Sequence, residues 1–262
     1  MDKQFLEGWA LILGASSGFG EAAALALAES GMNIIGVHLD RKGTLPNVAR
    51  ITEDIEKSGR RALFFNMNAA SVEKRAEVLE RLEAEGITVR VLVHSLAFGS
   101  LKPLIAEDER AAISRSQLEM TLDVMANSLV YWTQDLVRRD RFERGGRIYG
   151  LTSAGGTRVW PSYGAVSAAK AALESHVRQL ALELGPKEIS VNALRAGVTD
   201  TPALRKIPGS DEMIRIAKGK NPWGRLTTPE DVASIICLLS HPRANWVTGN
   251  VIGVDGGEFI VD

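Results

Sequence analysis

The feature that most constrains the fold of this chain is a regular alternation of short apolar runs and longer amphipathic stretches. Helical spacing is found at residues 18–30, 46–58, 72–86 and 160–177, and over a long region that ends near residue 140. Nearly continuous apolar strands separated by helices predict a parallel sheet covered on both faces. Right-handed crossovers then give a doubly wound α/β sheet of about seven strands. The predicted strands are residues 9–14, 33–39, 61–67, 89–97, 146–153, 189–197 and 249–257.

No linker or break in composition divides the 262 residues, so we expect a single domain over 1–262. The longest stretch without a predicted strand is 199–240. Its first part, 199–222, holds three prolines and two glycines and fits a helical substrate lid between flexible joints. The next helix is predicted to begin at Thr-Pro-Glu-Asp (228–231), with Thr228 as N-cap, Pro229 in the first helical position and acids in the first turn.

Composition excludes several classes of function. The formal net charge is −1 and no long basic block is present, which argues against a nucleic-acid partner. No apolar run approaches the length of a membrane span, and the short run at 9–14 is predicted to be a strand, not a signal peptide. A single cysteine, Cys237, excludes an internal disulfide and a multi-cysteine metal site, so we expect no metal. A cytoplasmic protein is the simplest expectation.

A glycine-rich loop joins the first predicted strand to the first helix. Gly14, Gly18 and Gly20 follow that strand directly. Glycines let the backbone turn tightly and approach a pyrophosphate closely, and the helix N-terminus supplies unpaired N–H groups with a positive dipole end. In a strand–loop–helix context this predicts a Rossmann-type dinucleotide site. The predicted cofactor contacts in the loop are Gly14, Ser16, Ser17, Gly18, Phe19 and Gly20.

The spacing Gly-x-x-x-Gly-x-Gly resembles that of the short-chain dehydrogenase/reductase family. The resemblance covers essentially the whole chain, with further matches at residues 91–99, 151–153, 191–201 and 248–257. It implies a nicotinamide-dependent oxidoreductase. By resemblance, Asn68 and Ala69 hold the adenine, Val198 contacts the carboxamide and Thr201 lies near the diphosphate and carboxamide. The remaining cofactor contacts that the resemblance implies are Ser95, Leu96, Ala97, Lys170 and Gly197.

The catalytic residues depart from the commoner pattern of this family, in which a tyrosine lies four residues before the lysine and a serine seventeen before it. Lys170 and Ser153 fill the lysine and serine places, but the tyrosine place holds Val166, and the nearest phenol is Tyr163. Seven residues are close to two helical turns, so Tyr163 and Lys170 are expected on one face of a helix, about 10 Å apart. This Tyr-x6-Lys spacing resembles the NADPH-dependent enoyl-[acyl-carrier-protein] reductases.

Other departures agree with that subgroup. Residues 94–98 (His-Ser-Leu-Ala-Phe) replace the usual Asn-Asn-Ala-Gly, Ala-Gly replaces Pro-Gly at 196–197, and Met125 stands where many members carry a catalytic asparagine. The resemblance implies that Tyr163 stabilises an enolate oxygen, and that Lys170 holds the nicotinamide ribose and makes the phenol more acidic. Ser153 is either a second hydrogen-bond donor to the substrate or a polar strand end.

The choice between NADPH and NADH depends on the end of the second strand. An acid there binds the adenosine ribose of NAD, but this chain has His38 at the position that is usually acidic. Asp40 follows two residues later and keeps NADH possible, whereas Arg41 and Lys42 suit a 2′-phosphate. We therefore expect NADPH to be preferred over NADH.

Three functions remain open. The first is reduction of 2-enoyl thioesters in fatty-acid synthesis, with the acyl group possibly carried on acyl carrier protein. The second is a carbonyl or hydroxyl oxidoreductase similar to the 3-oxoacyl reductases, and the third is an NAD(P)-binding protein without catalysis. Family resemblance implies a homotetramer or homodimer. Cations in or near the lid either meet an acidic carrier protein or form a solvated helix face: Arg205, Lys206, Arg215, Lys218 and Lys220.

Overall fold

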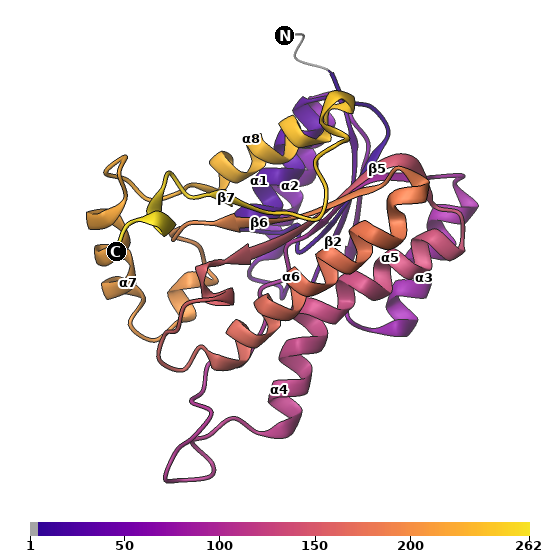
Figure 1. The fold of residues 1–262 in the computed structure, drawn as a ribbon. Helices are drawn as coiled ribbons and strands as arrows, with labels where there is room; N and C mark the ends of the chain where they lie inside the picture. Colours follow the sequence, from indigo (N-terminus) through magenta and orange to yellow (C-terminus); the bar gives the residue numbers. More distant parts are fainter. Residues whose placement is uncertain (1–4) are drawn as a thin grey trace.

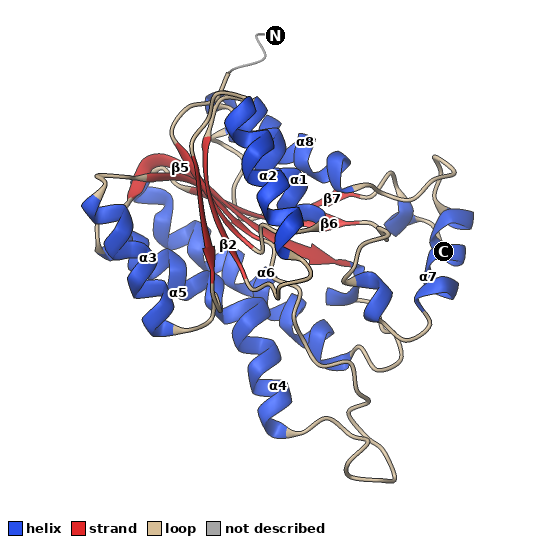
Figure 2. Cartoon of the chain, turned by 180° about the vertical axis from the view of Figure 1, so that it is seen from behind, coloured by secondary structure: helices blue, strands red, loops and turns tan. Residues whose placement is uncertain are grey.

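The computed structural model describes residues 5–262 and is built on one seven-stranded parallel sheet, in the order β3-β2-β1-β4-β5-β6-β7 (Figures 1 and 2). Residues of β1 are buried throughout, as expected for a central strand covered on both faces. The doubly wound sheet and its single-domain architecture are therefore confirmed. The strands are β1 (Trp9–Leu13), β2 (Asn33–His38), β3 (Ala62–Asn66), β4 (Val89–His94), β5 (Phe142–Ser153), β6 (Ser190–Ala196) and β7 (Val251–Val254).

Helices cover the two faces of the sheet in two groups (Figure 1). On one face pack α1 (Gly18–Glu29), α2 (Leu45–Lys57) and α8 (Pro229–Ser240). On the other pack α3 (Val72–Ala84), α5 (Ser128–Arg138) and α6 (Gly164–Leu184). The carboxyl ends of all seven parallel strands meet at one edge of the sheet, which is where ligands bind in such folds.

The long helical region before residue 140 is divided. It consists of α4 (Arg115–Leu122), a π-helical turn (Asp123–Asn127) and α5. Buried Met125 lies inside the π turn, at the place where the family carries a catalytic asparagine. Such π turns often occur at functional sites. The turn places methionine at position 125 and ends at Asn127.

The helix predicted over 160–177 begins later than expected, at Gly164. Ser162 adopts φ +62°, and the Tyr163 N–H donates to the Trp160 carbonyl, so residues 160–163 form a turn. Tyr163 is the N-cap residue of α6, and its carbonyl accepts the Ser167 N–H at 2.8 Å. The prediction that Tyr163 lies within the helix is therefore wrong, but the helical ladder starts from its carbonyl.

Residues 199–222, the predicted lid, are partly helical. They contain a 3-10 turn (Leu204–Lys206) and α7 (Ser210–Lys220), separated by Gly209 in a left-handed conformation. The start of α8 is as predicted, because Thr228 caps the helix and exchanges hydrogen bonds with Asp231 in a capping box. Over residues 5–262, none of the helices combines the length and apolar character that crossing a bilayer requires.

Candidate functional site

The glycine loop is shaped by close backbone contacts. Gly14 (φ +90°) and Gly18 (φ +55°) adopt conformations that favour glycine. A Cβ on Gly14 would lie 2.5 Å from the Ser95 carbonyl oxygen, and one on Gly20 would lie 1.9 Å from the Gly14 carbonyl oxygen. The loop therefore fits tightly between the ends of β1 and β4, and all three glycines are required.

The N-terminus of α1 is open for an anion. Its N-cap residue, Ser17, is extended and exposed, and its side chain makes no capping hydrogen bond. The first-turn N–H groups are thus not capped by that side chain, and they meet the positive end of the helix dipole. A Cβ on Gly18 would lie 3.5 Å from Thr201 Cγ2, so Thr201 faces this loop from the far side. These residues fit the pyrophosphate of a dinucleotide.

Asp40 lies beside the same loop. Its carboxylate bonds to His38 Nδ1 at 2.9 Å and to the side chains of Ser16 and Thr44, and these hydrogen bonds lower its pKa against the opposing effect of burial. The Asn66 side chain holds the Asp40 backbone: its Oδ1 accepts the Asp40 N–H at 2.9 Å, and its Nδ2 donates to the Asp40 carbonyl at 3.0 Å. Asp40 is consequently an ionised carboxylate fixed next to the glycine loop.

The other residues predicted around the adenosine are placed unequally. Asn68 is exposed after β3, whereas Ala69 is buried and its carbonyl accepts the Trp132 Nε1–H at 2.8 Å. Arg41 is exposed, while the His38 ring is buried against Phe64 and committed to Asp40. Phe19 packs partly into the core. The structure thus leaves Arg41 accessible and removes His38 from direct contact with a phosphate.

The end of β4 leads away from the glycine loop. The Ser95 N–H donates to the Leu13 carbonyl at 2.8 Å, and the chain becomes exposed at Ala97 after a half-buried Leu96. His94 is fully buried, bonds to Ser128 Oγ at 2.8 Å, and has its pKa lowered to about 3, mainly by burial and then by Lys170. A neutral His94 is therefore part of the core beneath the site.

Ser153 and Tyr163, two of the predicted catalytic residues, are hydrogen-bonded to each other. Burial raises the pKa of Tyr163, and a hydrogen bond with Ser153 opposes that rise. Gly155 makes the pairing possible, because a Cβ there would lie 2.5 Å from Tyr163 Cε1 and 3.2 Å from Ser153 Oγ. A phenol whose pKa lies above its ordinary value of 10 is protonated at neutral pH and can donate a hydrogen bond.

Lys170 lies deeper, behind this pair. Its Nζ donates to the Leu151 carbonyl at 2.7 Å, and the side chain is 7% exposed. Desolvation lowers its pKa to about 8, with Glu174 acting in the opposite direction. We expected Lys170 to make the Tyr163 phenol more acidic. That expectation is wrong, because the ammonium turns toward Leu151 and burial dominates at Tyr163.

The segment after β6 connects the two ends of the site. Ala196 pairs with Ser153 across the sheet, so Gly197 and Val198 follow directly beside the catalytic pair. Three residues later Thr201 reaches Gly18. The Val198 N–H donates to the Glu258 carboxylate at 2.9 Å, a contact that no sequence pattern predicts. A glutamate shortly after an Asp-Gly-Gly turn carries no recognisable signal by itself.

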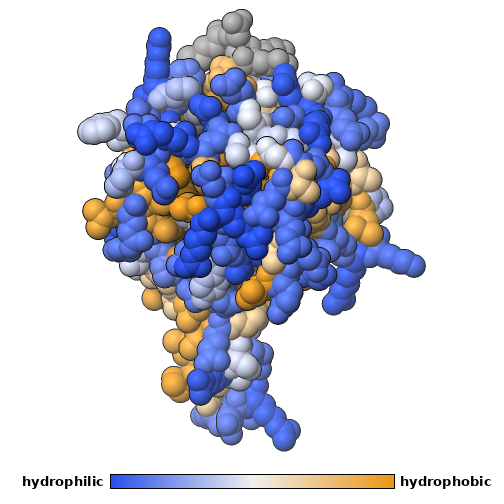
Figure 3. Space-filling view, turned by 90° about the vertical axis from the view of Figure 1, so that its right-hand side faces the viewer, coloured by the Kyte–Doolittle hydropathy of each residue, from blue (hydrophilic) through white to orange (hydrophobic). Residues whose placement is uncertain are grey.

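The lid and the loop before α4 adjoin the turn of residues 160–163. Trp160 Nε1–H donates to the Pro208 carbonyl of the lid at 2.9 Å. From the other side, a Cβ on Gly164 would lie 2.9 Å from Leu104 Cγ. Leu104 and its neighbour Ile105 are exposed, and apolar surface follows the lower protrusion formed by this loop and α4 (Figure 3). Apolar side chains therefore lie next to Tyr163.

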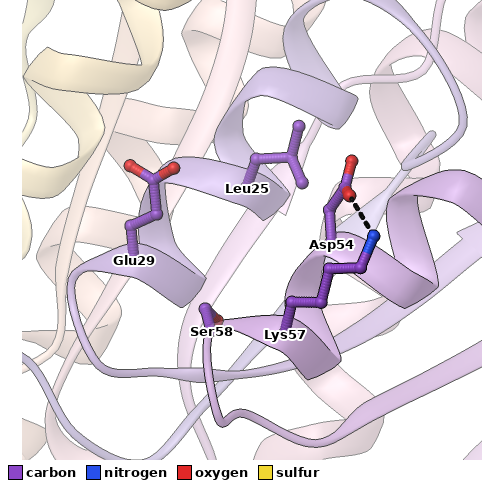
Figure 4. A pocket seen from close by; sticks show the side chains of 5 residues that line it. All are labelled: Leu25, Glu29, Asp54, Lys57 and Ser58. Atoms are coloured by element: carbon purple, nitrogen blue, oxygen red, sulfur yellow. Dashed lines mark ion pairs between the residues drawn. The ribbon is translucent and has the colours of Figure 1, made fainter.

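A separate pocket lies between α1 and α2 (Figure 4). It is lined by Leu25, Glu29, Asp54, Lys57 and Ser58, and Lys57 pairs with Asp54 at 3.7 Å. Glu29 ends α1, and a helix in this fold runs back from the carboxyl edge of the sheet, so the pocket lies at the opposite edge from the glycine loop. Within residues 5–262 no group of three or more metal-ligating side chains is found.

Comparison with known proteins agrees with this geometry. The profile of a family described as "Enoyl-(Acyl carrier protein) reductase" matches residues 14–258. The 3-oxoacyl-[acyl-carrier-protein] reductase FabG of Pseudomonas aeruginosa is 29% identical over 253 residues, 96% of this chain and 97% of the relative. The enoyl-[acyl-carrier-protein] reductase [NADH] FabI of Nostoc sp. is 30% identical over 246 residues, 94% of this chain and 92% of the relative. The structure of an enoyl-[acyl-carrier-protein] reductase (NADH) from Aquifex aeolicus has a TM-score of 0.84 at 26% identity, over 97% of this chain and 96% of that one.

Proposed function

This chain belongs to the short-chain dehydrogenase/reductase superfamily, within the family described as enoyl-(acyl carrier protein) reductase, and we propose that it reduces the C2=C3 bond of 2-enoyl thioesters. Membership makes it an oxidoreductase that uses a nicotinamide cofactor. Relatives of nearly equal identity are named for enoyl and for 3-oxoacyl reduction, so the reaction has to be inferred from the site.

The observation that carries the proposal is the position of the phenol. Tyr163 is the N-cap residue of α6, seven residues before Lys170, while the place four residues before Lys170 holds buried Val166, which cannot donate a proton. A carbonyl reductase needs its donor one bond from the carbon that receives hydride. In an enoyl thioester the charge develops two atoms further away, on the carbonyl oxygen. A donor set back along the helix axis by three residues, about 4.5 Å, suits the second case.

Each of the three predicted catalytic residues has a separate proposed role. When bound, the reduced nicotinamide would supply a hydride to C3, and a proton taken up from solvent at C2 of the resulting enolate would complete the reduction. Tyr163, kept protonated by burial, donates a hydrogen bond to the developing enolate oxygen. Ser153 holds the phenol through its hydroxyl. Lys170, whose Nζ donates to the Leu151 carbonyl in this structure, would hold the ribose hydroxyls of the bound cofactor. The exposed apolar side chains of Leu104 and Ile105 suit the acyl chain of the substrate.

The nucleotide preference is proposed from Asp40. The sequence favours NADPH through Arg41 and Lys42, and the exposure of both side chains is compatible with that prediction. However, the Asp40 carboxylate is ionised and is held by the Ser16 side chain. It would repel a 2′-phosphate and accept hydrogen bonds from a ribose diol. We therefore propose that Asp40 favours NADH, against the sequence-based preference, with NADPH as the alternative.

Docking of an acyl carrier protein has weaker support. In the lid, Arg205 pairs with Asp200 and Asp211, both at 2.6 Å, and Arg215 pairs with Glu212. These two cations are largely neutralised by the lid itself, so we propose an acyl thioester as substrate without assigning its carrier.

A 3-oxoacyl reductase is the second candidate, because the Ser153–Tyr163 pair also suits a ketone and because FabG is a relative over 96% of this chain. The deciding experiment follows oxidation of NADH and NADPH with crotonyl and acetoacetyl thioesters in parallel. The proposal expects turnover of the enoyl thioester at least tenfold above that of the keto thioester. Faster turnover of acetoacetyl thioester would favour the second candidate, and binding of dinucleotide without any turnover would favour a non-catalytic role.

A further inference from the structure

The C-terminal segment, residues 255–261, is fastened to the end of the lid. The Asp255 carbonyl accepts Asn221 Nδ2–H at 2.9 Å, and the Val261 carbonyl accepts Lys220 Nζ at 3.5 Å. Lys220 is the last residue of α7, and Asn221 is its C-cap. These two bonds join the end of α7 to the C-terminal segment.

The same segment is fastened to the stretch of chain between Ser153 and Tyr163. Arg158 lies between Ser153 and Tyr163 in sequence, and its Nη2 donates to the Phe259 carbonyl at 2.5 Å. Its guanidinium also lies over the Phe259 ring, with Arg158 Cζ 4.5 Å from the ring centroid. The C-terminal segment thus contacts both the lid and the turn that carries the phenol.

Glu258 makes the third contact. Its side chain is buried, with the residue 5% exposed, and Oε2 accepts the Val198 N–H at 2.9 Å. A Cβ on Gly197 would lie 2.9 Å from the same oxygen, so glycine is needed for the carboxylate to approach. Burying a carboxylate is costly unless it is hydrogen-bonded, and a bond from a backbone N–H to an ionised acceptor is among the stronger ones. This bond fixes the start of residues 197–201, the segment that follows Ala196 and ends at Thr201 beside Gly18.

The charges around Glu258 come from several elements. The pKa of Glu258 is raised, mainly by burial and also by Asp255, whereas the Val198 N–H, Lys220 of α7 and Arg158 favour the carboxylate form. The Glu258 carboxylate is thus surrounded by charges from α7, from the stretch between Ser153 and Tyr163, and from the C-terminal segment itself. The mechanism proposed above makes no use of it.

We propose that Glu258 is a positioning residue that holds Gly197 and Val198 against the nicotinamide end of the site and links that loop to the lid. The proposal rests on the proposed function in one respect, because it assumes a nicotinamide dinucleotide. Glu258 does not touch the reacting atoms. It acts through the Val198 N–H, and Lys220 and Asn221 connect it to the lid.

The test compares two ligands, of which only one carries the nicotinamide ring. Dissociation constants are measured by titration calorimetry for NADH and for ADP-ribose, or for NADPH and 2′-phospho-ADP-ribose if that pair binds more tightly. The variants are Glu258→Ala, Glu258→Gln as the conservative rescue, and Glu56→Ala as a matched control at an exposed glutamate of α2. Thermal unfolding of each variant confirms that it is folded.

We expect Glu258→Ala to raise the dissociation constant of the dinucleotide about tenfold, which is the effect of losing one charge-assisted hydrogen bond. ADP-ribose affinity should stay within twofold, and Glu258→Gln should recover most of the loss because its amide oxygen still accepts the Val198 N–H. Equal weakening of both ligands would overturn the proposal in favour of a general structural role, and so would unchanged affinity for both. Wild-type protein that binds neither ligand would instead refute the proposed function.

A double-mutant cycle tests the link to the lid. Lys220→Ala and Glu258→Ala are combined, and the dinucleotide affinities of all four proteins are compared. If the two residues act through one segment, the double variant should lose less affinity than the product of the two single losses. Strictly multiplicative losses would remove the lid from the proposal.

Discussion

The two ends of the candidate site are built in different ways. The adenosine end comes from one local unit, in which the glycine loop, α1 and the end of β2 place Gly14, Gly18 and Asp40 within 27 residues of one another. The nicotinamide end is assembled from β5, the turn before α6, the segment after β6 and the C-terminal segment. These parts are separated by more than a hundred residues, from Ser153 to Glu258.

This difference predicts how each end responds to substitution. At the adenosine end a side chain is held by neighbours in its own unit, so a change should alter affinity or selectivity locally. At the nicotinamide end the groups depend on one another through single hydrogen bonds, such as Ser153 with Tyr163 and Glu258 with Val198. Changes there should alter turnover, protonation or the affinity for one half of the cofactor.

The largest effect is expected from Tyr163→Phe. The change removes the hydrogen bond to the developing oxyanion and keeps the ring against Gly155, so kcat should fall about 10²- to 10³-fold. Steady-state kinetics with crotonyl thioester measure the loss, and dinucleotide affinity should remain near that of the wild type. Turnover close to the wild-type value would show that another group stabilises the oxyanion.

Lys170 should make the stability depend on pH. Its folded pKa, about 8, lies below the ordinary value of 10.5, because desolvation disfavours the charged form. Below pH 8 the cost of burying the charge is present in full. Between pH 8 and 10.5 the unfolded state binds more protons, so the free energy of unfolding rises with pH, by about 3 kcal/mol at most.

Urea unfolding of wild type and of Lys170→Met across this range isolates the contribution. The difference in unfolding free energy between the two proteins should change in favour of the wild type as the pH rises. A difference that stays constant from pH 7 to 10.5 would mean that Lys170 is not desolvated in the folded protein, and that the nicotinamide end is more open than its contacts indicate.

The smallest effect is expected at the adenosine end. Asp40→Asn removes the negative charge beside Ser16 and keeps the size of the side chain. The ratio of kcat/KM for NADPH to that for NADH should rise about tenfold, on the order of one relieved charge contact near the protein surface. Lys42→Ala, at an exposed neighbour, serves as the comparison and should lower the same ratio only slightly.

An unchanged ratio in Asp40→Asn would show that the carboxylate does not face the 2′ position, and would return the preference to the sequence-based expectation of NADPH. A large loss of turnover with both nucleotides would contradict the local character of this end.

The sequence by itself determined the parts that depend on short-range patterns. Seven strands, the glycine loop and the capped start of α8 follow from periodicity and from residue types that act on their own backbone, and each lies where it was predicted to within a few residues. The spacing of Tyr163 and Lys170 was also visible, although the helix begins only at Gly164 because residues 160–163 form a turn with Ser162 at positive φ.

Only the tertiary structure decided what those side chains meet. Lys170 donates to the Leu151 carbonyl instead of making the phenol more acidic, and His38 bonds to Asp40. Glu258 accepts the N–H of Val198, sixty residues away in sequence. The physical reason is the same in each case. Burial and hydrogen bonding depend on which segments the sheet order brings together, and a local pattern carries no information about a partner on another strand.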